Sequence, residues 1–323
     1  MNAIERVAVL GGTGFVGQAL CERLARHLPS TAVVVPTRRA QHGATLRALP
    51  TVELRVADVH DDAALASVLS GCDAVVHLVA VLHGSAATFE RVHVELPRRL
   101  AAACAAVGVR RVVHVSALGI GAMGDDPAAM PSDYLRSKSV GEALLRAAPL
   151  DLSVLRPSVM FGANDRFLNL FARLQRFAPV MPLAGGDAKL QPVWVDDVAE
   201  AIVRCLRRHE CIGQIYECAG PEVHSLAELV HLAGRWSGHP RPVLALPAAN
   251  GRLQARVLEC LPGEPLMSRD NLRSLQVPNV ASGKLPGLQA LGIEPASLRE
   301  VAPGYLARRG GRAFLDALRA ARR

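Results

Sequence analysis

The sequence predicts an α/β protein built on a doubly wound parallel sheet, with a smaller and mostly helical region toward the C-terminus. Three observations predict this fold class. An apolar run near the N-terminus ends in a glycine cluster, strand and helix patterns alternate through the first half, and this rhythm breaks after residue 158. With 323 residues, 50% of them hydrophobic, the chain is long enough for one large domain and a smaller one.

The first predicted strand is the apolar run at residues 7–10, which suits a strand buried on both faces of a sheet. It leads into residues 11–17, which satisfy both G-x-G-x-x-G and G-x-x-G-x-x-G. In such a turn Gly11 permits the tight bend, Gly14 lets the backbone approach a pyrophosphate, and Gly17 lets the helix pack on the strand. The helix N–H groups then face the anion. These residues therefore predict the nucleotide-binding turn of a Rossmann-type sheet.

The following elements continue the alternation of strand and helix. Helical segments such as 62–69 and 97–106 separate further strands, which are predicted at 32–36, 52–56, 74–79, 111–115 and 152–155, and a strand at 214–218 returns to the same sheet. We therefore expect a dinucleotide-binding domain at residues 1–158, to which residues 191–220 return. A smaller substrate or docking domain is expected at residues 159–190 and 221–323.

Composition excludes several classes of protein. The seven cysteines are scattered and form no C-x-x-C pair, and the eleven histidines lack ligand spacing, so neither a disulfide framework nor a metal site is predicted. No apolar run approaches the roughly 18 residues of a membrane span, and the N-terminus passes straight into the first strand. The expected location is therefore cytoplasmic.

The net charge of +8 is diffuse, and no fold signature of nucleic-acid binding accompanies it, so no nucleic-acid partner is predicted. The main basic cluster lies at the C-terminus, where apolar residues (Phe314, Leu315, Leu318) stand beside arginines (Arg308, Arg309, Arg312, Arg319, Arg322, Arg323). Two interpretations remain open: a terminal helix packed on its own domain, or a segment that lies on an anionic membrane surface.

The residues after the second and third strands bear on the choice of dinucleotide. NAD-specific folds place an acidic residue after the second strand, but here the chain has Arg38 and Arg39. Guanidinium groups bind a 2′-phosphate bidentately, so the pair favours NADP(H) over NAD(H), although it is also compatible with solvated surface. After the third strand, Asp58 and Val59 are placed to contact an adenine edge, while Asp58 suits a turn or helix cap equally well.

A second motif, Y-x-x-x-K, joins Tyr134 to Lys138 after the fifth strand. The chain has only three tyrosines and three lysines, so this spacing is unlikely to arise by chance. On a helix the two side chains share one face, where Lys138 reaches a nicotinamide ribose and its charge is expected to lower the pKa of the phenol. Tyr134 would then be a general acid or base.

The glycine turn, the fifth strand and the Y-x-x-x-K motif together resemble the extended short-chain dehydrogenase/reductase superfamily, the NAD-dependent epimerases and dehydratases. Similarity continues at residues 156–162 (RPSVMFG) and 191–199 (QPVWVDDVA). In the second segment the resemblance implies a short strand that runs into a helix, with Asp196 and Asp197 as capping residues.

Two departures from the superfamily narrow the resemblance. The fifth strand of such enzymes usually ends in a Ser-Ser or Ser-Thr pair whose second member hydrogen-bonds the reacting carbonyl, but here Ala117 takes that position. Ser116 is a catalytic candidate only with a register shift or a bulge, because strand neighbours point to opposite faces. Residues 93–97 (HVELP) replace the N-V-x-G-T of sugar-nucleotide epimerases, which argues against a UDP-sugar epimerase.

With these departures, the chain resembles one subfamily: the NADPH-binding accessory subunit of respiratory complex I (NADH:ubiquinone oxidoreductase) and its bacterial relatives. Residues 134–142, 166–172, 268–271, 285–288 and 291–293 also carry this resemblance. It implies a nucleotide bound as a structural or redox-sensing element, and docking to a membrane-associated respiratory complex at the inner face of the cytoplasmic membrane. The implied cofactor-binding residues are Gly11, Thr13, Gly14, Phe15, Val16, Gly17, Arg38, Asp58, Val59, Leu78, Tyr134, Lys138 and Pro157.

An alternative is an active NAD(P)H-dependent reductase or epimerase/dehydratase that acts on a small carbonyl or hydroxyl substrate. Tyr134 would transfer the proton, Lys138 would orient the ribose, and Ser116 would be the remaining hydroxyl candidate. The sequence does not name the substrate, and whether the chain is an enzyme stays open. A purely structural scaffold with an empty pocket is disfavoured by the complete glycine set.

Overall fold

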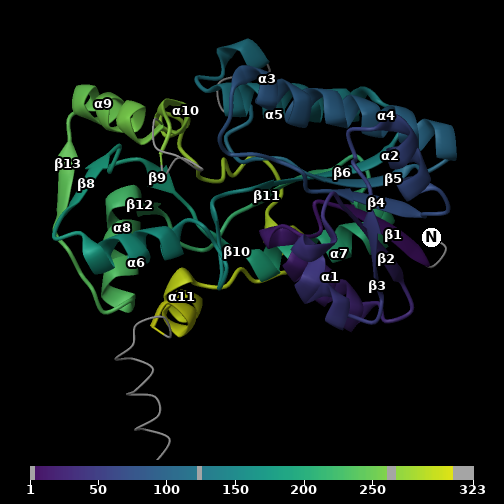
Figure 1. Ribbon diagram of the computed structural model, residues 1–323, viewed down its shortest axis with the longest axis horizontal. Helices are drawn as coiled ribbons and strands as arrows, with labels where there is room; N and C mark the ends of the chain where they lie inside the picture. Colours follow the sequence, from purple (N-terminus) through teal and green to yellow (C-terminus); the bar gives the residue numbers. More distant parts are fainter. Residues whose placement is uncertain (1–3, 122–125, 260–266, 308–323) are drawn as a thin grey trace, which may run out of the picture. The chain divides into compact units, whose positions relative to one another are not determined.

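The computed structural model describes residues 4–121, 126–259 and 267–307, which form two compact units (Figure 1). The first unit comprises Met1–Pro157, Val195–Cys218 and Ser282–Glu294, and the second comprises Ser158–Trp194, Ala219–Ala281 and Pro295–Arg323. Residues 191–194 and 219–220, predicted to return to the first domain, belong to the second unit. Residues 282–294, predicted in the smaller domain, belong to the first unit. Two hydrogen bonds hold residues 282–294 on the first unit. The Glu217 backbone N–H donates to Pro286 O at 2.9 Å, and the Arg204 side chain donates through Nη1 to Leu291 O at 2.6 Å.

The first unit contains a seven-stranded parallel sheet in the order β11-β6-β5-β4-β1-β2-β3. Its strands are β1 (Arg6–Leu10), β2 (Ala32–Thr37), β3 (Val52–Val56), β4 (Ala74–His77), β5 (Arg111–Val115), β6 (Asp151–Pro157) and β11 (Ile215–Cys218). The strand order reverses at β1, so the sheet is doubly wound as predicted. In such sheets ligands bind where the order reverses, at the carboxyl ends of the strands.

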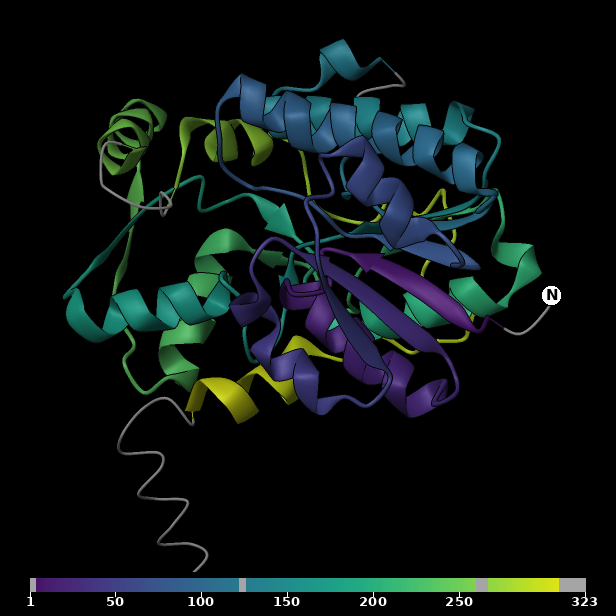
Figure 2. The ribbon, with the colours of Figure 1, turned by 45° about the vertical axis from the view of Figure 1, so that its right-hand side comes forward.

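Helices cover both faces of this sheet, as Figures 1 and 2 show. One face carries α1 (Phe15–His27) and α7 (Val195–Arg207), and the other carries α2 (Asp62–Leu69), α4 (Leu96–Val107) and α5 (Asp133–Ala147). The central strands are buried on both faces because they are runs of Val, Ala and Leu. Their side chains pack with Leu65, Leu100 and Leu145 from the second helical layer.

Local signals explain where the helices near the site begin and end. The Ser132 hydroxyl accepts the Leu135 N–H and caps α5 two residues before Tyr134. The short helix α3 (Ala86–Phe89) runs into a π-helical turn, η2 (Glu90–Glu95), and then into α4. Helix α4 ends at Gly108, whose φ of 79° lies in the left-handed region. The two acidic residues assigned as caps, Asp196 and Asp197, lie in the first turn of α7.

The second unit combines helices with three two-stranded sheets. Its helices are α6 (Leu168–Phe177), α8 (Leu226–Trp236), α9 (Ala248–Glu259), α10 (Arg269–Ser274) and α11 (Leu298–Leu306). Its strand pairs are β7 (Met160–Phe161) with β10 (Val193–Trp194), β8 (Met181–Ala184) with β13 (Val243–Leu246), and β9 (Lys189–Leu190) with β12 (His224–Ser225). Helices α6 and α8 form its core together with Phe161 and Leu190.

Within the described residues, no helix is both long enough and apolar enough to cross a membrane, and no group of His, Cys, Asp or Glu side chains is arranged to hold a metal ion. The C-terminal arginines and apolar residues beyond position 307, on which the membrane-surface hypothesis depends, lie outside the described residues.

Candidate functional site

The β1–α1 turn is closed so tightly that only glycine fits at two of its positions. Gly11 has a φ of 87°, and a Cβ there would lie 3.2 Å from the backbone of Leu78 and Val79. A Cβ on Gly17 would overlap Gly11 O and the Gly12 Cα. Gly17 is therefore required by the backbone of the turn itself, whereas we had expected it to allow packing on the strand. The Gly14 N–H donates to Gly11 O at 2.9 Å, and Gly14 itself is exposed.

The other residues predicted at this turn lie around it. Thr13, Phe15 and Val16 are half-buried at the start of α1, and Leu78 is half-buried directly after β4. The Leu78 N–H donates to Leu10 O at 2.9 Å, which ties the end of β4 to the end of β1. The first turn of α1 thus stands at the carboxyl edge of the sheet with Gly14 open to solvent, the geometry in which a helix N-terminus receives a phosphate.

Positive charge gathers at the ends of β2 and β3. Burial lowers the pKa of His60, and Arg91, Arg38 and Arg99 lower it further, which places these three cations around one imidazole. Asp62 holds Arg99 at 2.6 Å, but the side chains of Arg38 and Arg91 make no hydrogen bond or ion pair within the described residues. Sequence reasoning missed Arg91, because it lies on η2 and reaches this edge only through the fold.

Asp58 takes the turn role that the sequence left open. Its Oδ1 accepts the His60 N–H at 3.0 Å, and its backbone oxygen accepts the Asp61 N–H at 3.0 Å. The carboxylate therefore stabilises the connection from β3 to α2. Val59 is half-buried beside it.

Tyr134 and Lys138 occupy α5 as predicted, but their electrostatics differ from the expectation. Lys138 is 3% exposed, its Nζ donates to Val115 O at 2.9 Å, and burial lowers its pKa to about 8 even though Glu142 favours the charged form. Burial raises the pKa of Tyr134 to about 12. The expected lowering of the phenol pKa by Lys138 is therefore wrong, because desolvation of the phenolate dominates. Tyr134 keeps its proton at neutral pH.

The segment after β5 holds Ser116 and Ala117, both buried. The Ser116 N–H donates to Leu155 O at 2.7 Å, and the Leu118 N–H donates to Pro157 O at 2.9 Å, so β6 fixes the path of this segment and brings Pro157 to it. The Ser116 Oγ is buried without a hydrogen-bond partner among the described residues. Ala117 offers no donor, and the two hydrogen bonds to β6 keep the regular two-residue step of a parallel ladder, so no bulge turns Ser116 to the side of Ala117.

Two histidines that the sequence gave no role form a buried pair below this segment. His77 and His114 face each other in register on β4 and β5, their rings are stacked at 5.0 Å, and their Nδ1 atoms are 2.9 Å apart. Burial lowers the pKa of both imidazoles, and Lys138 lowers it further. Both rings are therefore neutral at physiological pH, and one Nδ1 donates to the other. Their equivalent places at two strand ends are the signal that could have identified the pair.

A buried ion pair anchors α5 to β6. Arg156 Nη2 and Nε contact the two carboxylate oxygens of Glu142 at 2.6 and 3.1 Å, and Arg156 Nη1 donates to Ile120 O at 3.0 Å. The Glu142 side chain is 2% exposed. This bidentate contact fixes the helix that carries Tyr134 and Lys138.

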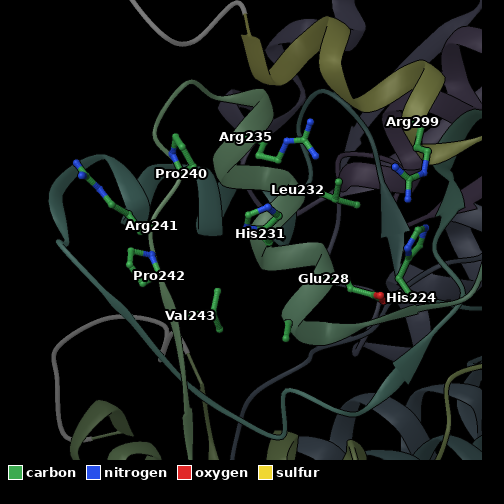
Figure 3. Close-up of a pocket in the computed structure, with 11 residues that line it drawn as sticks. His224, Glu228, His231, Leu232, Arg235, Pro240, Arg241, Pro242, Val243 and Arg299 are labelled. Atoms are coloured by element: carbon green, nitrogen blue, oxygen red, sulfur yellow. The ribbon is translucent and has the colours of Figure 1, made fainter.

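A groove of about 610 Å³ lies within the second unit, along one face of α8 (Figure 3). Its ionic side chains are used in local packing: Glu228 accepts the Ser225 N–H at 2.6 Å, Arg241 Nε donates to Gln175 O at 3.0 Å, and Arg299 pairs with a neighbouring glutamate at 3.5 Å. None of the predicted site residues lines it. We therefore assign no cofactor to this groove.

Comparison with known proteins agrees with this geometry. The model of the NAD dependent epimerase/dehydratase family matches residues 7–219. The chain is 30% identical over 299 residues to NADH dehydrogenase [ubiquinone] 1 alpha subcomplex subunit 9, mitochondrial, of Rattus norvegicus, covering 90% of this chain and 76% of that protein. It is also 30% identical over 203 residues to a ceramide reductase of Caulobacter vibrioides (62% and 61% covered), and 27% identical over 261 residues to a 2-alkyl-3-oxoalkanoate reductase of Stenotrophomonas maltophilia (73% and 77% covered).

Solved structures share the fold. A dTDP-glucose 4,6-dehydratase from Streptomyces venezuelae with NAD and TYD bound has a TM-score of 0.72 at 22% identity, covering 96% of this chain and 98% of that chain. An NADPH-dependent quinone oxidoreductase from Escherichia coli, complexed with NADPH, has a TM-score of 0.70 at 21% identity, covering 93% and 99%. One of these neighbours holds NAD and the other holds NADPH, so the likeness does not distinguish the two dinucleotides.

Proposed function

Because this chain belongs to the NAD dependent epimerase/dehydratase family, we propose that it binds NADP(H) and uses the nucleotide as a structural or redox-sensing element, docked to a membrane-associated respiratory complex. The observation that carries the nucleotide proposal is the closed β1–α1 turn, in which Gly11 and Gly17 admit no side chain while Gly14 is open to solvent. Gly11–Gly17 would hold the pyrophosphate, and Leu78 would border the bound nucleotide.

Two arginines whose side chains have no ionic partner among the described residues, Arg38 and Arg91, support NADP(H) over NAD(H). Arg38 follows β2, where an NAD-specific chain would place a carboxylate. Arg38 and Arg91 both act on the imidazole of His60. Asp58, the acidic side chain that acts on the same imidazole, already accepts a backbone N–H within its own turn. A 2′-phosphate would provide the counter-charge for both guanidinium groups.

The proposed non-catalytic role has support from the chemistry around α5 and from the relatives. Ala117 removes the usual donor to a reacting carbonyl, and loss of one such donor commonly costs about a hundredfold or more in rate. The mitochondrial relative is named as a subunit of NADH dehydrogenase [ubiquinone], which supports docking to a respiratory complex.

A second candidate function is carbonyl reduction, which the names of the two bacterial relatives favour. A phenol with its pKa near 12 holds its proton at neutral pH, so Tyr134 would act as the acid that protonates the carbonyl oxygen. Lys138 would hold the nicotinamide ribose, and Ser116 Oγ would reach that oxygen only after a local shift of the segment that carries it. A bound reduced nicotinamide supplies the hydride in this chemistry.

The first experiment is to purify the protein without added nucleotide, denature it, and identify what it releases. We expect NADP(H) at close to one equivalent. Arg38→Ala should weaken NADPH binding about tenfold to a hundredfold and leave NADH binding unchanged, since a charged hydrogen-bonded contact is worth about 1.5–3 kcal/mol. Arg39→Ala is the matched control, because Arg39 is the neighbouring exposed arginine and, unlike Arg38, is not among the cations that lower the pKa of His60.

Different outcomes separate the candidates. Release of NADH, or an Arg38→Ala variant that binds NADPH normally, would overturn the NADP(H) proposal. Oxidation of bound NADPH by a panel of carbonyl compounds, lost in Tyr134→Phe, would establish the reductase. If the protein retains about one equivalent of NADPH and no carbonyl compound oxidises it, the result supports the structural or sensing role.

A further inference from the structure

His93 connects two segments that the proposed nucleotide site depends on. It lies on η2, is 2% exposed, and contacts both the segment after β4 and the helix α5. We infer that His93 is a positioning residue that holds the Leu78–Gly84 segment at a set place relative to Tyr134. The inference rests on the proposed function where it gives Tyr134 and Leu78 their roles, but the contacts themselves do not depend on it.

The hydrogen bonds of His93 determine its tautomer. The Val81 backbone N–H is only a donor, so His93 Nε2, 3.1 Å away, must be the unprotonated acceptor. The proton is then on Nδ1, which donates to Ser137 Oγ at 2.9 Å. The Ser137 hydroxyl in turn donates to Tyr134 O at 3.0 Å. Every polar atom of the ring is used, and the chain of bonds runs from the loop after β4 to the backbone of the tyrosine.

Packing holds the ring in this orientation. Phe89 stacks on it at 5.5 Å between centroids, and Tyr134 meets it edge-on at 5.6 Å. The backbone of His93 is also seated directly on α5, because a Cβ at Gly141 would overlap His93 O. Side chain and backbone of one residue thus contact α5 at Ser137 and, one helical turn later, at Gly141.

The neutral form of His93 preserves these hydrogen bonds. Burial, together with the neighbouring Lys138 and His77, lowers the pKa of His93 to about 3. A protonated Nε2 would lose the Val81 bond, so this neutral ring is the form that the connection requires. The connection therefore persists through the physiological pH range.

The geometric consequence concerns the proposed nucleotide site. Leu78 and Tyr134 border it from different elements, and His93 is the buried residue that bonds to the segment of one and the helix of the other. Loss of the His93 bonds should therefore loosen the loop first and weaken nucleotide binding as a result.

Amide hydrogen exchange at Val81 tests this inference on the full chain. His93→Phe keeps a ring of similar size but removes both hydrogen bonds, and we expect exchange at Val81 to become about tenfold faster or more. His93→Gln can place its amide oxygen near the Nε2 position and should restore exchange to within about threefold of the wild type. Ser137→Ala removes only the hydrogen bond to His93 Nδ1 and should give a smaller increase in the Val81 exchange rate. It replaces His93→Phe in the test if that variant does not fold.

His224→Gln is the matched control, since His224 is a buried histidine of the second unit. It should leave Val81 exchange unchanged even where it lowers overall stability. NADPH affinity is measured on the same variants, with about a tenfold loss expected in His93→Phe.

The two proposals fail in different ways. If His93→Phe and Ser137→Ala both exchange Val81 at the wild-type rate, the positioning role of His93 is wrong, whether or not the protein binds NADPH. If the wild-type protein binds no NADP(H), the proposed function is wrong, while the Val81 exchange rates still decide the role of His93.

Discussion

The β1–α1 turn and the cluster around α5 lie at the same carboxyl edge but are specified by different physics. In the turn, close approach of backbone atoms admits only hydrogen at Gly11 and Gly17. Around α5, buried polar side chains hold one another: Arg156 with Glu142, His93 with Ser137. Gly17 is thus specified by residues adjacent in sequence and Gly11 by its own positive φ as well as by the backbone after β4, whereas the cluster depends entirely on side chains that the fold brings together.

The largest expected loss of stability comes from a glycine-to-alanine substitution, which can be made in both regions. Gly17→Ala and Gly141→Ala each force a Cβ onto backbone atoms, so each should lower the free energy of unfolding by about 4 kcal/mol or more. Gly17→Ala should also abolish nucleotide binding. Gly304→Ala is the control, because nothing lies within 4 Å of its Cβ and it sits inside α11. Urea denaturation measures all three, and a Gly141→Ala protein as stable as Gly304→Ala would contradict the close contact with η2.

The next largest loss of stability is expected in the cluster around α5 alone. Arg156→Met leaves the Glu142 carboxylate buried without its partner, which should cost about 3–5 kcal/mol in the free energy of unfolding. The double variant Arg156→Met/Glu142→Leu should recover much of this loss, because no unpaired charge remains. Arg110→Met, which breaks an exposed ion pair with Asp151, should cost no more than about 1 kcal/mol. Equal losses for Arg156→Met and Arg110→Met would show that the buried pair is not an anchor.

The smallest effect is the acid sensitivity of the cluster. The unfolded chain binds protons at His77 and His114 below pH 6.5, whereas the folded protein resists them because His77 titrates near pH 3 and His114 is also lowered. Stability is therefore lost as pH falls from 6.5, by about 2 kcal/mol at pH 5 from His77. His77→Leu/His114→Leu should remove this part of the slope between pH 7 and pH 5. Equal slopes in the variant and the wild type would show that the histidines are not protected from protonation.

Much of the fold was predictable because its signals are local. Apolar runs bounded by turns predicted all seven strands of the main sheet, and the order of elements predicted their parallel arrangement. The division into units differs in two places, since residues 282–294 return to the first unit, while residues 191–194 and 219–220 belong to the second unit. The backbone link between Glu217 and Pro286 that holds residues 282–294 on the first unit has no sequence pattern.

The sequence by itself determined the glycine pattern of the turn, the strands of the sheet and the spacing of Tyr134 and Lys138, because each is marked by a pattern of residues a few positions apart. The tertiary structure alone decided the surroundings of those residues. It brought Arg91 near Arg38, gave His93 its two partners, and raised the pKa of Tyr134 where the sequence predicted a lowering. The physical reason is that burial and long-range contacts, which no local pattern contains, set the charge and hydrogen bonding of a side chain.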